Sequence, residues 1–266
     1  MEFRTLGNLA LCIDGRDITP TAPKQRQALA LLLLRTGQRV SMPTLIDEIW
    51  DGSPPRTAMT ALQTYIGVIR RTMAEAGGTT VKQVAAERLM TDGNTYVLRV
   101  DDDEWDKPAF DLFVQRGREA VAQGDAAEAE RLLRMALSRW RGQPLGNVRL
   151  GRILAPYAER LGELHLGARE LLVEALLRMR RSQEAVEEAT ELASEFPYHE
   201  NVHAQLMRAL YGAGRRAAAL EVYQRLRSRM GEALGITPSP SVNTLHHVML
   251  QDEPDEQFLA LSGAAR

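Results

Sequence analysis

Hydrophobic and polar positions alternate over short stretches at the start of the chain and then change to a helical period. Segments 2–6 and 9–13 alternate or run apolar, and Asp14-Gly15 is a typical hairpin turn that leads to Arg16-Asp17-Ile18, so short strands are expected here. Three helices are expected next, judged from their apolar runs, caps and breakers: one from Pro23 that stops at Gly37, one capped by Ser41, and one from about Arg56 to Ala76.

A second hairpin ends this first region. The segments 87–91 and 95–100 have strand character and flank the turn Asp92-Gly93-Asn94. Strands, three helices and a terminal hairpin are the plan of a winged helix-turn-helix. The acidic run at 101–104 follows at once and predicts a domain boundary near residue 100.

Beyond the acidic run the pattern is helical and repeats itself. Residues 172–189 align with residues 206–223 at a shift of 34 residues. In this alignment Ala175 matches Ala209, Leu176 matches Leu210 and Ala185 matches Ala219. A 34-residue period with small residues where helices cross is typical of tetratricopeptide repeats, and a generic helical bundle is the alternative. The expected fold class is therefore mainly α with small β elements. It comprises an N-terminal winged helix-turn-helix over 1–100 and an all-α tetratricopeptide-like helical repeat domain over 101–266.

Composition narrows the class of protein. Hydrophobic residues at 44% and charged residues at 26% are ordinary for a globular chain. The one cysteine, Cys12, cannot form an internal disulfide. We find no apolar run of membrane-spanning length and no secretion signal, so the sequence predicts a cytoplasmic protein.

The charge is unevenly distributed along the chain. The net charge is −2, but residues 1–100 carry 12 Lys and Arg against 9 Asp and Glu, and the remainder carries 21 against 26. No acidic residue lies between Asp51 and Glu75, a stretch that holds three arginines. A local basic stripe favours a polyanion as partner, although a solvated helix face is the simpler alternative.

A helical wheel of the third helix separates two faces. The apolar face comprises Ala58, Leu62, Tyr65, Ile66, Ile69 and Met73. The opposite face comprises Thr57, Thr60, Thr64, Gly67 and Arg71, with Arg56 at its edge. Small side chains allow a helix to enter a DNA groove, threonine and arginine can contact base edges, and a helix N-terminus attracts phosphate. The wheel therefore predicts a DNA-reading helix, and a protein-binding face is the alternative.

The chain resembles the Streptomyces antibiotic regulatory protein family, which activates secondary-metabolite gene clusters. The resemblance rests on PKQRQALALLLLRTGQRVS, LIDEIWDGSPPRTAMTALQTYIGVIRR, TYVLRVD and QLMRALYGAGRRAAALEVYQRLRSRMGEALGITPSPSV. It implies an OmpR-type winged helix followed by a bacterial transcriptional activation domain. It further implies binding, as a dimer, to direct repeats in promoters of antibiotic clusters and recruitment of RNA polymerase through its sigma subunit. It implies no cofactor.

The resemblance also assigns DNA contacts, which agree with the outward face of the wheel and add the wing. The expected contacts are Arg56, Thr57, Thr60, Thr64, Arg70, Arg71, Lys24, Thr91, Asn94 and Tyr96. The chain departs from the family at Gly67 and Val68, where many relatives are basic or polar. It also departs in the wing, where the glycine of the family's Thr-x-x-Gly-Tyr pattern is displaced.

Two other functions compete with this interpretation. His199, Glu200 and His203 form an H-E-x-x-H sequence, which on a helix can bind zinc for hydrolysis, but it opens a predicted repeat helix. No phosphate-binding glycine loop is present, so we expect no enzyme and no metal site. The second competitor is a helical-repeat adaptor that binds only proteins, which DNA-binding assays would distinguish.

Overall fold

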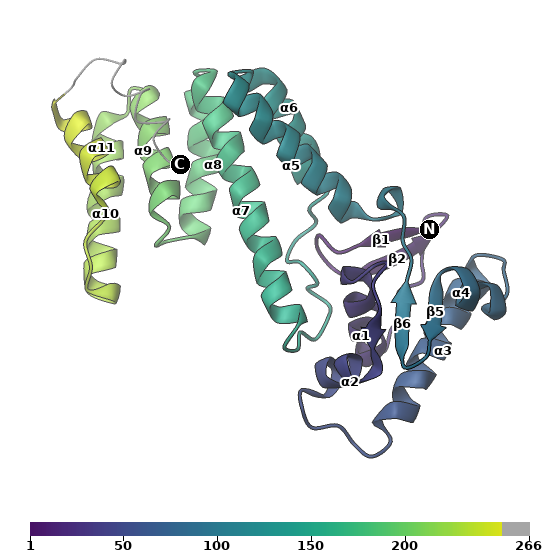
Figure 1. Cartoon of the computed structure of the whole chain (residues 1–266). Helices are drawn as coiled ribbons and strands as arrows, with labels where there is room; N and C mark the ends of the chain where they lie inside the picture. Colours follow the sequence, from purple (N-terminus) through teal and green to yellow (C-terminus); the bar gives the residue numbers. More distant parts are fainter. Residues whose placement is uncertain (252–266) are drawn as a thin grey trace. The chain divides into compact units, whose positions relative to one another are not determined.

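The computed structural model of the chain describes residues 1–251 (Figure 1). Contacts divide it into two compact units. The first unit combines Met1–Phe113 with Met135–His165, and the second combines Val114–Arg134 with the residues from Leu166 onward. The division falls inside helices, so the chain passes between the units more than once.

Two small antiparallel sheets belong to the first unit. The first sheet has the order β1-β2-β3 and comprises Glu2–Arg4, Ala10–Ile13 and Arg16–Asp17. The second sheet has the order β4-β6-β5 and comprises Val40–Ser41, Thr95–Leu98 and Leu89–Asp92. Strands β5 and β6 form the predicted terminal hairpin, with Asp92 opposite Thr95 at the turn.

The three predicted helices follow the first sheet, and strand β4 of the second sheet lies between the first two of them. They are α1 (Pro23–Leu34), α2 (Met42–Trp50) and α3 (Ala58–Ala76). Ser41 caps α2 as predicted, since its Oγ accepts a hydrogen bond from the backbone N–H of Thr44 at 3.1 Å. Helix α1 is buried over most of its length and packs against α2 and α3 in a single apolar core. The winged helix-turn-helix is therefore confirmed.

The first unit also contains a helix that the sequence pattern did not predict. Helix α4 (Val81–Glu87) lies between α3 and β5 (Figure 1). Thr80 caps it by accepting a hydrogen bond from the Gln83 backbone N–H at 3.2 Å. Seven residues make only two helical turns, which is too short for a hydrophobic period to show.

Residues beyond position 100 complete the first unit. The acidic run forms a 3-10 turn, Asp102–Glu104, and Glu104 pairs with Arg88 at 2.6 Å instead of lying free in a linker. The buried carboxylate of Asp106 accepts hydrogen bonds from the backbone N–H of Thr5 at 2.9 Å and of Leu6 at 3.2 Å. The backbone at the end of β1 is thus satisfied by a residue a hundred positions later.

A second anchor joins α2 to the segment before α7. Glu48 of α2 is fully buried, and its carboxylate accepts hydrogen bonds from the backbone N–H groups of Gly151 and Ile153, each at 2.7 Å. Nearby, the side chain of Asn147 pairs with both the N–H and the C=O of Leu9, at 2.8 and 3.0 Å. The helix-turn-helix and the residues 145–154 therefore form one packed body.

The remaining regular elements of the described residues are helices. The helices are α5 (Asp106–Gln123), α6 (Ala126–Leu137), α7 (Leu154–Arg178), α8 (Ser182–Glu195), α9 (Glu200–Gly212), α10 (Arg216–Leu234) and α11 (Pro240–Gln251). Helices α8 to α11 pack as successive neighbours within the second unit. Within residues 1–251, no helix combines the length and apolar character needed to span a bilayer.

The predicted 34-residue repeat is present in these helices. Helices α8 and α10 begin 34 residues apart, at Ser182 and Arg216. The turns before them are equivalent, because Arg180 and Gly214 both have positive φ, at 58° and 75°. The matched alanines, which are Ala175, Ala209, Ala185 and Ala219, are all fully buried. The small residues that recur at this spacing are thus buried, as the repeat pattern predicted.

Candidate nucleic-acid interface

Helix α3 buries the apolar stripe that the wheel selected. Its buried residues include Ala58, Leu62, Ile66, Ile69 and Met73. Tyr65 differs from the prediction, because it is half-buried and stacks on Trp50 of α2 with ring centroids 6.2 Å apart. The stripe fixes the rotation of α3, so the opposite face is directed away from the core.

The outward face of α3 brings five predicted DNA contacts together. Arg56, Thr57, Thr60, Thr64 and Arg71 are all exposed. The hydroxyl of Thr64 donates a hydrogen bond to the Thr60 backbone carbonyl at 2.9 Å, which leaves its oxygen lone pairs free to accept from a base or a water molecule. The face is neutral to basic.

Sequence reasoning missed one polar residue of this surface. Gln63 is exposed on α3 between Thr60 and Thr64. A glutamine amide can both donate to and accept from an adenine edge in the major groove. The wheel assigned Gln63 to neither face, and its exposure in the structure is the signal that adds it to the outward one.

The N-terminus of α3 is suited to binding an anion. Thr57 occupies the N-cap position, and its side chain makes no capping hydrogen bond. The partial positive charge of the helix N-terminus therefore lies beside the exposed side chain of Arg56. This arrangement suits a backbone phosphate.

Three expected DNA contacts turn out to hold the wing in place. Arg70 donates from Nε to the Leu89 carbonyl and from Nη2 to the Thr91 hydroxyl, both at 2.8 Å. Tyr96 is only 3% exposed, and its ring centroid lies 5.9 Å from the Arg70 guanidinium carbon. Burial lowers the pKa of Arg70 and raises that of Tyr96. The Tyr96 side chain thus belongs to the core, and Arg70 and Thr91 connect α3 to the hairpin; that these three residues contact DNA stays a prediction.

Replacing Arg70 by methionine is expected to loosen the wing. The variant keeps an apolar stem but loses both hydrogen bonds to β5, so we expect the free energy of unfolding to fall by about 1 kcal/mol. Hydrogen exchange at Leu89 and Thr91 should accelerate. Arg71→Met is the matched control, because Arg71 is the exposed neighbour on the same helix. Equal effects of the two substitutions on denaturant unfolding would contradict this role for Arg70.

The two other expected contacts belong to elements other than α3. Asn94 is exposed at the tip of the wing, and its backbone carbonyl accepts a hydrogen bond from the Met42 N–H at 3.0 Å. Lys24 is half-buried, with its ammonium 4.4 Å from the centroid of the Trp50 ring. Asn94 is thus free to contact DNA with its side chain, whereas Lys24 is engaged in a cation–π contact.

The residues of the H-E-x-x-H sequence do not converge. His199 Nδ1 lies 3.5 Å from Glu170, His203 Nε2 contacts the Pro197 carbonyl at 3.2 Å, and Glu200 accepts from the Ser239 N–H at 2.6 Å. Across the described part of the chain, no three His, Cys, Asp or Glu side chains are grouped as metal ligands. Each residue thus has its own separate partner.

Comparisons with known proteins cover both parts of the chain. The family described as bacterial transcriptional activator domain matches residues 105–250, and the family described as transcriptional regulatory protein, C terminal, matches residues 15–87. The regulatory protein DnrI of Streptomyces peucetius is 37% identical over 96% of this chain and 93% of its own length. The transcriptional regulatory protein MoaR1 of Mycobacterium tuberculosis is 33% identical over 97% of this chain and 82% of its own. A solved structure of Mycobacterium tuberculosis EmbR in complex with a low-affinity phosphopeptide matches with a TM-score of 0.89 and 30% identity, over 99% of this chain and 68% of that one.

Proposed function

The chain belongs to the Streptomyces antibiotic regulatory protein family of transcriptional regulators. From this premise we propose that it is a cytoplasmic protein that activates transcription of an antibiotic biosynthetic gene cluster. In this proposal it binds direct repeats in promoter DNA as a dimer and recruits RNA polymerase through the sigma subunit. The observation that carries the proposal is the exposed, acid-free outward face of α3.

We assign DNA reading to α3, to its N-terminus and to the tip of the wing. Arg56 and the helix N-terminus contact phosphate, while Thr57, Thr60, Thr64 and Arg71 face the major groove. Gln63 and Asn94 extend these contacts at the edges of the surface. The wing is held in place by Arg70, which lies between α3 and the hairpin.

We assign protein contacts to the helical repeats. Residues 101–266 carry 21 basic against 26 acidic side chains, so this part of the chain adds no net attraction for phosphate. Two protomers on adjacent repeats gain affinity from their raised effective concentration without further DNA contacts. Activation then depends on residues that the DNA does not touch.

A gel shift with the DNA upstream of neighbouring genes, followed by in vitro transcription with purified polymerase, tests the proposal. The full chain is expected to retard a fragment that contains direct repeats and to raise transcription from it. Retardation without activation would remove the polymerase part of the proposal. Failure to bind any upstream fragment, together with capture of a protein partner, would favour the adaptor function instead.

Replacing Arg71 by alanine distinguishes a contact to a base from a contact to a phosphate. If Arg71 reads a guanine, affinity should fall by about 1–3 kcal/mol for the cognate site, and discrimination at that base should relax. If it contacts a phosphate, binding should weaken alike on every sequence. Stability should not change, because the side chain is exposed. Binding titrations on the cognate site and on single-base variants measure both quantities. Unchanged affinity on every sequence would exclude Arg71 from the interface.

A further inference from the structure

Arginines are concentrated in the segment that joins α6 to α7 and in its flanks. Residues 131–158 contain six arginines and no acidic residue, although residues 101–266 as a whole are net acidic. The six are Arg131, Arg134, Arg139, Arg141, Arg149 and Arg152. A local excess of positive charge favours a polyanion as partner, so the surroundings of each arginine decide whether such a site is present.

Four of the six arginines have partners within the fold. Three form ion pairs with carboxylates, and the fourth lies against an aromatic ring. The partners are Glu128 for Arg131, Glu130 for Arg134, Asp106 for Arg141 and the Phe113 ring for Arg139. The other two, Arg149 and Arg152, are exposed and belong to the first compact unit, which also contains the winged helix.

Both of these arginines have guanidinium N–H groups to offer. Within residues 1–251, Arg149 forms no hydrogen bond or ion pair. Arg152 pairs through Nε with Asp51 at 3.1 Å, and the two side chains are 64% and 63% exposed. Its guanidinium lies over Gly52, where an added Cβ would be 3.2 Å from Nη2. An exposed ion pair is weak and screened by salt, so the N–H groups of Nη1 and Nη2 are available to a phosphate.

The backbone of residues 149–152 is anchored, although its arginine side chains are exposed. The Gly151 N–H donates to the buried Glu48 carboxylate, and Val148 belongs to the apolar core. The segment therefore lies beside the C-terminal end of α2, where the loop to α3 begins at Asp51 (Figure 1). An anchored backbone holds the two guanidinium groups at a fixed place, which lowers the entropic cost of binding.

This place lies toward the other end of α3 from the wing. The loop that begins at Asp51 leads through Arg56 into the N-terminus of α3, whereas Arg70, in the C-terminal half of α3, holds the wing. From Ala58 to Arg70 the helix rises about 18 Å at about 1.5 Å per residue, more than the width of the major groove, about 12 Å. Elements near the two ends of α3 can therefore reach the two phosphate backbones that border the groove.

We propose that Arg149 and Arg152 bind the DNA backbone beside the N-terminal end of α3, as a phosphate contact supplied from outside the winged helix. The inference rests on DNA reading by α3, proposed above. The ligand is the phosphate of double-stranded DNA, so the contact adds affinity and no base specificity. The net acidic charge of residues 101–266 is an average, and these two arginines are a local exception to it.

Salt-dependent binding of the full chain to a promoter fragment that the wild type retards tests this proposal. In the variant Arg149→Gln/Arg152→Gln, we expect affinity to fall roughly tenfold, alike on the cognate site and on single-base variants. The slope of log affinity against log salt should become shallower by about 1.8, which is about 0.9 for each phosphate contact.

Two failures of this experiment are distinguishable. Wild-type affinity and slope in the double variant would overturn the proposal and leave DNA reading by α3 intact. Failure of the wild type to bind any promoter fragment would overturn the proposed function, and this inference with it. A loss confined to the cognate site would also contradict a phosphate contact, because phosphates carry no sequence information.

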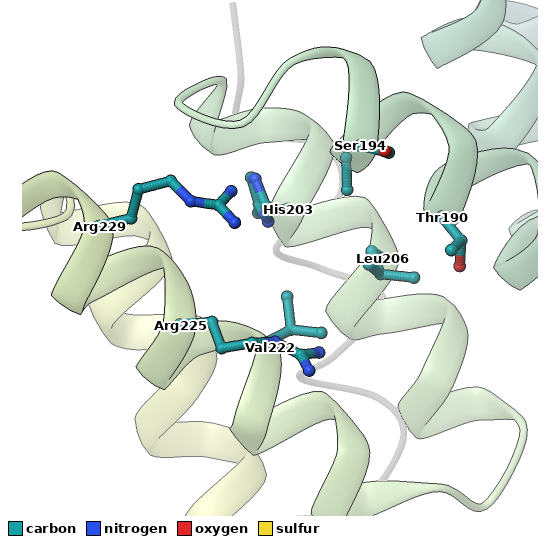
Figure 2. Close-up of a pocket in the computed structure, with 8 residues that line it drawn as sticks. Thr190, Ser194, His203, Leu206, Val222, Arg225 and Arg229 are labelled. Atoms are coloured by element: carbon teal, nitrogen blue, oxygen red, sulfur yellow. The ribbon is translucent and has the colours of Figure 1, made fainter.

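The variant Arg225→Gln/Arg227→Gln is the matched control, because it changes the net charge equally. Arg225, drawn in Figure 2, is 60% exposed and forms an exposed ion pair at 3.1 Å, as Arg152 does, and Arg227 is exposed. Both control residues lie on α10 in the second unit. We expect wild-type affinity and slope in the control. An equal loss in both double variants would show a general effect of net charge and would overturn the assigned contact.

The substitution Asp51→Asn separates a direct phosphate contact from an effect on the loop. Asp51 has a positive φ of 50°, which asparagine tolerates. If Arg152 contacts phosphate, the substitution removes a competing carboxylate, and affinity should rise by about two- to fivefold, the range of a surface ion pair. If Arg152 only holds the loop through Asp51, binding should weaken as it does in Arg152→Gln, and that result would overturn the proposal.

Discussion

Ending the chain after Val100 is expected to leave the winged helix without a cooperative unfolding transition. The truncation removes four side chains that belong to the same apolar core as Phe3 and Leu9: Trp105, Leu145, Val148 and Leu154. A fully buried side chain of this size contributes about 1.5–3 kcal/mol, so their combined loss is comparable with the whole stability of a domain, about 5–15 kcal/mol. The polar anchors Asp106, Asn147 and Gly151 would be lost with them.

Thermal unfolding followed by circular dichroism measures this effect. The fragment 1–165 is the matched control, because it retains every residue of the first compact unit. We expect 1–165 to unfold cooperatively and 1–100 to show a broad, weak transition. Equal midpoints for the two fragments would show that residues 101–165 are not needed for the winged helix to fold.

Replacing Gly151 by alanine is the second large expected effect. A Cβ at this position would lie 2.5 Å from the backbone carbonyl oxygen of Glu48 and 2.6 Å from its Oε1. The segment would have to move, which would break the hydrogen bonds from Gly151 and Ile153 to the buried carboxylate. Overpacking and unsatisfied buried groups together should lower the free energy of unfolding by about 3 kcal/mol.

Gly162→Ala is the matched control for this substitution. Gly162 lies in α7, and an added Cβ there would meet no atom within 4 Å, so alanine should stabilise the helix by about 0.5–1 kcal/mol. Combining Gly151→Ala with Glu48→Ala should cost less than the sum of the single losses, because both remove the same contact. Additive losses in denaturant unfolding would contradict the proposed anchor.

The sequence predicted the elements that have a strong local signal. The turn sequences Asp14-Gly15 and Asp92-Gly93 predicted the two hairpins, and Ser41 predicted the N-cap of α2. The helical period of the apolar residues predicted the core face of α3. The 34-residue repeat was visible because alanines recur at its spacing, and these alanines are buried. In each case the residues that determine the structure are close in sequence or recur with a fixed spacing.

Features that depend on distant residues could not be predicted. The acidic run from 101 looked like a linker, yet Glu104 and Asp106 bind Arg88 and Thr5. Arg70 was assigned to DNA through the family resemblance, and only the position of β5 shows that its guanidinium also donates to the Leu89 carbonyl within the protein. Tyr96 was assigned to DNA through the wing, although strand alternation turns its side chain inward.

The most direct test of the proposed function is the salt dependence of promoter binding by the full chain and by the double variant Arg56→Ala/Arg71→Ala, with Arg227→Ala as a control. We expect tight binding by the wild type and the control. In the double variant, affinity should fall at least about tenfold, and the slope of log affinity against log salt should become shallower by about 0.9 for each phosphate contact removed. Identical affinity and slope for the double variant and the wild type would contradict DNA reading by the outward face of α3.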